Sequence, residues 1–381
     1  MFVRSYRMKN KFVYLTKPFK NPLRIFKVSK KRIHTVPKEG PWSVLFFGVD
    51  DFSLESLKGL HEEYKLKTLC RLEVVTTLQN KKHEVRDYAM ENGIVMRTWP
   101  VTFDIEGFHI GIVVSFGHLI PKKIINSFPL GMLNVHGSLL PKWRGASPIT
   151  YSLKNGDTHT GVTIMNILPK KFDIGEIIAQ EQISINPDET LPELRAKLAK
   201  IGANLLIETI KKLPSILSNG RPQNEKEATY APKFTSKLSL IKWDEMSAID
   251  IYNLQRALVG LYPLTTKFRN MTIKLLDIQK IEKPNHLSHI EPNIPGVATF
   301  DKVNKVLIVK CKGNDWISVT KICIPERRPM SANDFNNGFI LERTKTIKDT
   351  IIVSLSLSLS YFVCIYIYIY IYTFEITYDF V

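Results

Sequence analysis

The sequence predicts an α/β protein with a parallel sheet in its N-terminal part and a small β-barrel-like domain in its C-terminal part. Short apolar runs alternate with helical patterns over the first half of the chain, which is typical of a parallel sheet covered by helices. From Leu238 onward the pattern changes to short strands, with a hairpin turn at Gly313-Asn314. A length of 381 residues also favours two domains over one.

The N-terminal elements are expected in a regular order. We expect strands at 43–48, Leu72–Thr76, Ile110–Ser115, Met132–Val135, Gly161–Ile167 and Ile177–Ile185. We expect helices at 52–60, Val85–Glu91 and Leu191–Leu213, and a short one that begins at Pro121. Such an arrangement is a Rossmann-like sheet with helices on both faces. In these sheets, ligands bind beyond the carboxyl ends of the strands.

Five segments divide the chain. They are a basic leader at 1–38, the α/β domain at 39–213, a polar linker at 214–235, the β-barrel domain at 236–342 and an anomalous low-complexity tail at 343–381. Within the β-barrel domain we expect a helix at Ala248–Val259 and strands at Thr272–Ile278, Gly296–Thr299, Val306–Val309 and Trp316–Val319. The barrel resembles the oligonucleotide-binding kind.

Charge and cysteine content restrict the class of protein. The net charge is +17, but residues 1–38 alone contain 12 Lys and Arg and no Asp or Glu. A basic, acid-free start with interspersed apolar residues is typical of a mitochondrial transit peptide, and we favour this over a disordered basic arm. The four cysteines show neither zinc-binding nor disulfide spacing. We therefore expect no metal site and a reducing compartment, the mitochondrial matrix.

The tail contains two strict dipeptide repeats, Ser-Leu and Ile-Tyr, within an uncharged stretch from Thr350 to Phe374. Such alternation is what TC and AT nucleotide repeats encode, so we interpret the tail as translated microsatellite and the true C-terminus as missing or misread. The stretch is long enough to cross a bilayer, and a tail anchor is the alternative interpretation. We expect no stable membrane association.

Asn134, His136 and Asp173 are candidates for acid–base chemistry at the edge of the predicted sheet. Asn134 and His136 share one side of a strand because strand side chains alternate, and Asp173 precedes a loop glycine. An amine that attacks an acyl carbon forms an oxyanion, which the amide and the imidazole can stabilise. The carboxylate can orient the imidazole and help to remove the proton of the amine. Each residue taken singly could also have a purely structural role.

Lys142, Trp143 and Arg144 follow this strand in a loop. One interpretation is an ordinary solvated loop with a packed tryptophan. The other is contact with the phosphates and bases of a tRNA acceptor arm.

The string NVHGSLLPKWRGASPI at 134–149 resembles the signature of the methionyl-tRNA formyltransferases, a branch of the folate-dependent formyltransferases. Four other stretches agree: SFGHLIP at 115–121, GDTHTGVTIMNI at 156–167, FDIGEII at 172–178 and ATYAPKFTSKLSLIKWDE at 228–245. The resemblance covers residues 42–340, most of the chain.

The resemblance implies a Rossmann-like formyltransferase domain and a C-terminal barrel that helps to bind tRNA. Its activity would be transfer of the formyl group of 10-formyltetrahydrofolate, without a metal, to the amino group of initiator methionyl-tRNA in mitochondria. Asn134, His136 and Asp173 fall on the catalytic positions. We expect the protein to act as a monomer.

By the same resemblance, the loop Ser138, Leu139, Leu140 and Pro141 binds the formyl-folate donor. Lys142, Trp143 and Arg144 are then the candidates for tRNA contact.

Two departures from the family pattern affect these expectations. The loop after the second strand, long and basic in bacterial members, is short here at Thr77–Glu84, so tRNA contact is weaker or involves other basic residues. The early FGTP-like turn reads Phe47-Gly48-Val49-Asp50. Two alternatives stay open: a folate-dependent formyltransferase acting on a small amine, and a catalytically inactive copy.

Overall fold

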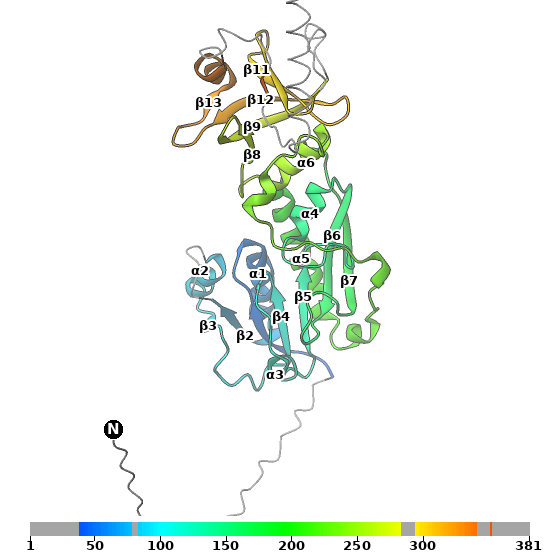
Figure 1. Cartoon of the computed structure of the whole chain (residues 1–381). Helices are drawn as coiled ribbons and strands as arrows, with labels where there is room; N and C mark the ends of the chain where they lie inside the picture. Colours follow the sequence, from blue (N-terminus) through cyan, green and yellow to red (C-terminus); the bar gives the residue numbers. More distant parts are fainter. Residues whose placement is uncertain (1–37, 78–82, 283–293, 341–350, 353–381) are drawn as a thin grey trace, which may run out of the picture. The chain divides into compact units, whose positions relative to one another are not determined.

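The computed structural model describes residues 38–77, 83–282, 294–340 and 351–352 (Figure 1). The leader expected at 1–38, apart from Lys38, and the tail expected at 343–381, apart from 351–352, lie outside these residues. The centre of the short loop Thr77–Glu84 also lies outside them. The described part of the chain contains two sheets, and each has a hydrophobic core of its own.

The first sheet has seven strands in the order β3-β2-β1-β4-β5-β6-β7. The strands are β1 (Trp42–Phe47), β2 (Leu69–Thr76), β3 (Val95–Thr98), β4 (Ile110–Val114), β5 (Met132–His136), β6 (His159–Asn166) and β7 (Ile177–Ser184). All neighbours from β3 to β5 are parallel, as the sequence predicts. In contrast, β6 and β7 join antiparallel, so the sheet is mixed. The order reverses between β1 and β4, which places the ligand-binding edge of the fold there.

Both faces of this sheet are covered because the side chains of its strands alternate. From β1, Val44 and Phe46 pack with three helices, whereas Leu45 and Phe47 pack with the segment 99–108 and the short helix α3 on the opposite face. The helices are α1 (Asp51–Lys65), α2 (Glu84–Glu91), α3 (Lys122–Ile125), α4 (Pro148–Lys154) and α5 (Leu191–Lys211); α1, α2 and α5 cover the first face.

Local chemistry fixes where the covering helices begin. Asp50 and Ser53 form a capping box that starts α1, and Thr190 and Glu193 form another that starts α5. Gly202 lets α5 approach the sheet closely, because a Cβ there would lie 3.0 Å from Val135. These helix starts lie at the edge of the sheet that carries the candidate site.

The second sheet is antiparallel and follows a polar segment with three short 3-10 turns, η1 (Ser215–Asn219), η2 (Glu225–Glu227) and η3 (Ser236–Ser239). Its order is β14-β10-β11-β12-β9-β8, and β13 pairs with β12. The Gly313-Asn314 hairpin turn joins β11 to β12, as predicted. The elements are α6 (Ala248–Leu258), β8 (Leu264–Phe268), β9 (Met271–Ile281), β10 (Val297–Asp301), β11 (Val306–Lys310), β12 (Trp316–Cys323), β13 (Met330–Ser331), α7 (Ala332–Phe335), the π-helix η5 (Asn336–Ile340) and β14 (Ile351–Ile352).

Arg256 of α6 attaches the second domain to the first. Its side chain is 5% exposed, and its guanidinium donates to the carbonyls of Glu189 and Leu153 at 3.2 and 3.5 Å and to the amide oxygen of Asn253 at 2.9 Å. Burial lowers the pKa of Arg256 from its usual value, and the nearby Tyr252 and Asp188 oppose that shift.

Replacement of Arg256 by methionine should therefore lower stability. We expect the free energy of unfolding to fall by about 1.5–3 kcal/mol, the range for hydrogen bonds made by a charged group. Urea denaturation of Arg256→Met measures this loss, with Arg328→Met, a change at an exposed arginine, as the matched control. Equal stabilities for the two variants would contradict the role of Arg256.

Candidate active site

The candidate site lies at the carboxyl ends of β1, β4 and β5. Asn134 and His136 lie on β5, two residues apart, so their side chains leave the strand on the same side. His136 is buried and 6% exposed, whereas Asn134 is half-buried. Within the described residues, the Asn134 amide makes no hydrogen bond to another side chain or to the backbone, so its donors are available to a substrate.

The ring of His136 is fixed from two directions. Its Nε2–H donates to the carbonyl of Trp143 at 3.0 Å, because a carbonyl can only accept. Its Nδ1 lies 3.9 Å from Oδ1 of Asp173, a contact that becomes an ion pair when the ring is protonated. The structure thus brings together His136 and Asp173, which lie far apart in the sequence.

Asp173 is held by both its side chain and its main chain. Oδ2 accepts the N–H of Gly145 at 2.9 Å, and Oδ1 faces His136. Its backbone adopts a left-handed conformation, with φ at 56°. The amide of Gln223 donates to the carbonyls of Asp173 and Gly175 at 3.0 and 2.8 Å.

The loop Ser138–Pro141 packs closely against β6. Ser138 and Leu140 are buried, whereas Leu139 and Pro141 are half-buried. The hydroxyl of Thr163 donates to the Ser138 carbonyl at 2.7 Å and accepts the Leu140 N–H at 3.1 Å. The backbone of this loop is thus fixed beside His136.

Lys142, Trp143 and Arg144 differ in their surroundings. Lys142 is exposed, and its ammonium lies 3.4 Å from Asp157. Trp143 is half-buried and donates its indole N–H to the same carboxylate at 2.7 Å. Arg144 is only 3% exposed, and its guanidinium contacts Gln223 and Glu225.

The polar segment predicted as a linker also contributes to the site. The N–H of Trp143 donates to the Thr229 hydroxyl at 2.9 Å, the N–H of Arg144 donates to the Thr229 carbonyl at 2.8 Å, and the N–H of Ala231 donates to the Arg144 carbonyl at 2.7 Å. Sequence reasoning missed Gln223 and Thr229, because each lies more than 70 residues from its partner and belongs to no periodic pattern.

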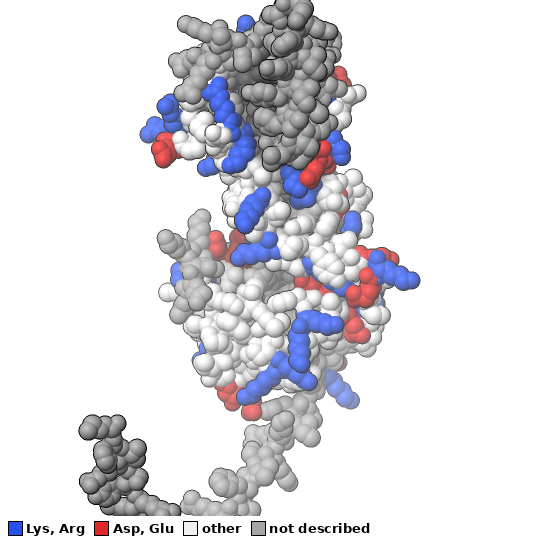
Figure 2. All heavy atoms as spheres, in the orientation of Figure 1, with Lys and Arg blue, Asp and Glu red and all other residues white. Residues whose placement is uncertain are grey.

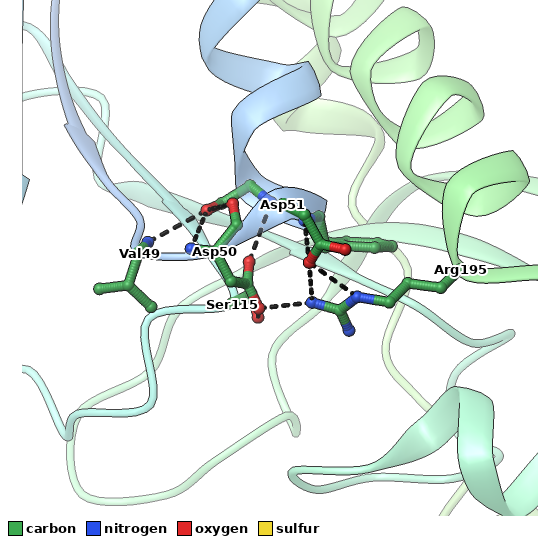
Figure 3. A network of polar contacts seen from close by, with 7 residues as sticks. Val49, Asp50, Asp51, Ser115 and Arg195 are labelled. Carbon is green, nitrogen blue, oxygen red and sulfur yellow. Dashed lines mark hydrogen bonds and ion pairs between the residues drawn. The ribbon is translucent and has the colours of Figure 1, made fainter. Parts of the chain in front are cut away.

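A second polar network lies where β1 and β4 end (Figure 3). Ser115, at φ 48°, donates its hydroxyl to Asp50 at 2.5 Å. Arg195 of α5 reaches across to Asp50 at 2.5 Å and to Asp51 at 2.7 Å. Burial alone would raise the pKa of Asp51, but the hydrogen bond and charge of Arg195 outweigh it and lower that pKa.

The lowered pKa of Asp51 predicts an acid-dependent contribution to stability. A carboxylate with a depressed pKa stabilises the fold above its unfolded pKa, about 3.9, and the contribution is lost as the pH falls through the lower folded value. We expect Arg195→Met to lower stability at neutral pH by no more than about 1 kcal/mol, because the pair is partly exposed. The difference should shrink below about pH 4.

Thermal unfolding of the wild type and Arg195→Met across this pH range measures the effect. Lys200→Met, on the exposed side of the same helix, is the control. A difference that stays constant with pH would contradict the contribution of Asp51.

Taken together, the site offers an imidazole, a carboxylate and an amide that has no hydrogen-bond partner in the described part of the chain, an arrangement suited to acyl transfer to an amine. Among residues 38–77, 83–282 and 294–340, no three His, Cys, Asp or Glu side chains are grouped as metal ligands. The helices described here are all too short or too polar to cross a membrane.

Comparison with known families identifies both domains. The family model described as Formyl transferase matches residues 104–210, and the one described as Formyl transferase, C-terminal domain, matches residues 233–340. A mitochondrial methionyl-tRNA formyltransferase of Homo sapiens is 40% identical over 316 residues, which cover 80% of this chain and 79% of that protein. A methionyl-tRNA formyltransferase of Finegoldia magna is 32% identical over 311 residues, or 77% of this chain and 96% of that protein.

Two solved structures share the fold. One is a sugar 3N-formyl transferase crystallised in the presence of dTDP and 5-N-formyl-THF, with a TM-score of 0.54 and 19% identity; the match covers 76% of this chain and 100% of that one. The other is an N-formyltransferase from Helicobacter canadensis, with a TM-score of 0.54 and 18% identity, covering 73% of this chain and 98% of that one. At these identities the likeness concerns the fold alone.

Proposed function

Because this chain belongs to the methionyl-tRNA formyltransferase family, we propose that Asn134, His136 and Asp173 transfer a formyl group to the amino group of methionyl-tRNA. The chain is a mitochondrial formyl-transferring enzyme that serves translation initiation, like the mammalian relatives named mitochondrial. The matrix is the proposed location within the organelle. The observation that best supports the catalytic roles is the contact of His136 with Asp173, 3.9 Å apart, beside the free amide of Asn134.

In the proposed mechanism, Asn134 stabilises the negative charge that develops on the formyl oxygen. Attack of the amine on the formyl carbon forms a tetrahedral oxyanion, and an amide N–H fixed in advance stabilises it more than water does. His136 lies beside Asn134 on β5 and contributes its charge to the same region once it is protonated. Loss of one such donor costs about 10²–10³ in rate.

Asp173 faces the imidazole and orients it. With Nε2–H bound to the Trp143 carbonyl, Nδ1 is the atom that gains a proton, and the carboxylate of Asp173 faces it. The carboxylate thereby orients the ring and assists removal of the proton that the attacking amine loses, and collapse of the oxyanion then releases the donor, whose nitrogen takes up a proton as it leaves. The proposal includes activity as a monomer.

The proposed formyl donor is 10-formyltetrahydrofolate, bound by the loop Ser138, Leu139, Leu140 and Pro141. Two features support this assignment. The loop directly follows His136, and Thr163 fixes its backbone. A donor seated there would have its formyl group close to the catalytic side chains.

We propose that, within the loop 142–144, Lys142 is the residue that contacts the phosphates of the tRNA. It is exposed and contacts Asp157 at 3.4 Å, whereas Trp143 is half-buried and Arg144 is buried against its partners. Lys170 and Lys171, which precede Phe172 and Asp173, are also exposed and extend the positive charge beside the site. On the face shown in Figure 2, basic and acidic side chains are interspersed over the described surface.

The test is transfer of a labelled formyl group by the full chain. Methionyl-tRNA and glycinamide ribonucleotide compete as acceptors, and the Asp173→Ala protein is the control. Labelled formylmethionyl-tRNA that is absent with the control supports the proposal. Label on the small amine would favour the alternative substrate class, and no transfer from a folded protein would identify an inactive copy.

A further inference from the structure

We infer that Arg144 is a positioning residue for the catalytic carboxylate, acting through Gln223 on the backbone of Asp173 and Gly175. This inference rests on the proposed role of Asp173. In this inference, Arg144 holds the catalytic loop in place and does not make the expected contact with tRNA.

The guanidinium of Arg144 is buried, and almost all of its N–H groups have hydrogen-bond partners. Nε and Nη2 both donate to the side-chain oxygen of Gln223, at 3.0 and 2.8 Å. Nη1 and Nη2 also donate to the two carboxylate oxygens of Glu225, at 2.9 and 2.8 Å. The hydrogen bond to Glu225 raises the pKa of Arg144 against the opposing effect of burial. Gln223 and Glu225 accept from four of the five N–H groups, and Tyr230 is a further hydrogen-bond partner, which leaves little for a phosphate.

These contacts decide which way the amide of Gln223 points. An amide has one oxygen that accepts and one nitrogen that donates. Because the oxygen accepts twice from Arg144, the nitrogen must face the carbonyls of Asp173 and Gly175, to which it donates at 3.0 and 2.8 Å. A neutral side chain in place of Arg144 would leave the amide free to turn.

The backbone that Gln223 holds carries the catalytic carboxylate. Asp173 has a left-handed backbone, which costs energy for a residue with a side chain and needs support from its surroundings. The neighbouring Gly145 N–H holds the carboxylate itself at 2.9 Å. Two consecutive residues, Arg144 and Gly145, thus hold the main chain and the side chain of the same aspartate.

The decisive variant is Gln223→Glu. A glutamate still accepts from Arg144, so the buried charge keeps a partner, but an ionised carboxylate cannot donate to the two carbonyls. We expect kcat to fall by about 10–100-fold with little change in the KM for methionyl-tRNA, because displacement of a catalytic group by about 1 Å costs up to about 10²-fold. Gln182→Glu, the same change on the exposed side of β7, is the matched control.

Arg144→Met should produce a loss of the same size, and Arg144→Lys should restore only part of it, because lysine cannot make the fork of contacts. In an Asp173→Ala background, Gln223→Glu should have no further effect on turnover. A normal kcat in Gln223→Glu, or an equal loss in the Asp173→Ala background, overturns the inference. A raised KM for methionyl-tRNA in Arg144→Met with unchanged kcat would also overturn it and indicate phosphate binding. Failure of the proposed function is separate, since the wild type itself would then transfer no formyl group.

Discussion

Replacement of Asp173 by alanine is expected to lower kcat by about 10²–10⁴, the range for loss of a group that supports acid–base and electrostatic catalysis. The carboxylate faces Nδ1 of His136 at 3.9 Å and is positioned by the N–H of Gly145. Without it, the imidazolium that forms during the reaction loses its counter-charge. Binding of methionyl-tRNA should change little, because the carboxylate is turned towards the N–H of Gly145 and the ring of His136.

Comparison with Asp173→Asn separates charge from position. Asparagine keeps an oxygen that accepts from Gly145 but has no negative charge, so a loss as large as that of alanine shows that the charge matters. His136→Ala should cause a similar loss, and the double variant should not add the two losses, because the residues act as a unit.

Single-turnover transfer measures these rates. Asp104→Ala removes a loop aspartate on the exposed surface and is the control. Near-normal turnover in Asp173→Ala would refute the proposed mechanism.

Much of the fold is predictable because burial leaves a periodic pattern. The strands β1 and β4 are almost continuous apolar runs, and the long α5 has a clear apolar face, so both types of element are found from sequence. The edge strand β3 was missed because none of its four side chains is buried. The antiparallel entry of β6 is not visible in its composition, because direction is set by the connection through α4 and not by the strand itself.

The site was predictable where neighbouring residues carry the chemistry. Asn134 and His136 share a strand, and a strand's period of two assigns them to one side without a structure. The supporting residues were not predictable in this way. Gln223 lies in a polar segment whose composition is typical of a linker. Arg195 lies on a helix whose apolar pattern identifies only the residues of its buried face. Their contacts depend on which segments the fold brings together.

Gly145→Ala should damage stability and activity together. The residue has φ at 126°, a conformation that a side chain rarely adopts, and an added Cβ would lie 2.5 Å from the carbonyl oxygen of Ala231. That oxygen belongs to the linker backbone and accepts the N–H of Ser147 at 3.1 Å, so it cannot move without disturbing this hydrogen bond. We expect the free energy of unfolding to fall by about 2–5 kcal/mol from backbone strain and overpacking.

Activity should fall for a related reason. Relief of the clash moves the Gly145 N–H, which positions the Asp173 carboxylate, so kcat should drop by about 10²-fold at a temperature where the variant is still folded. Gly93→Ala is the matched control: Gly93 also has a positive φ, at 64°, but an added Cβ would meet no atom within 4 Å. In the control, urea denaturation should show only a small loss of stability, about 1–2 kcal/mol, and kcat should not change. If Gly145→Ala resembled Gly93→Ala in both measurements, close packing of the linker on this loop would not be what positions the catalytic aspartate.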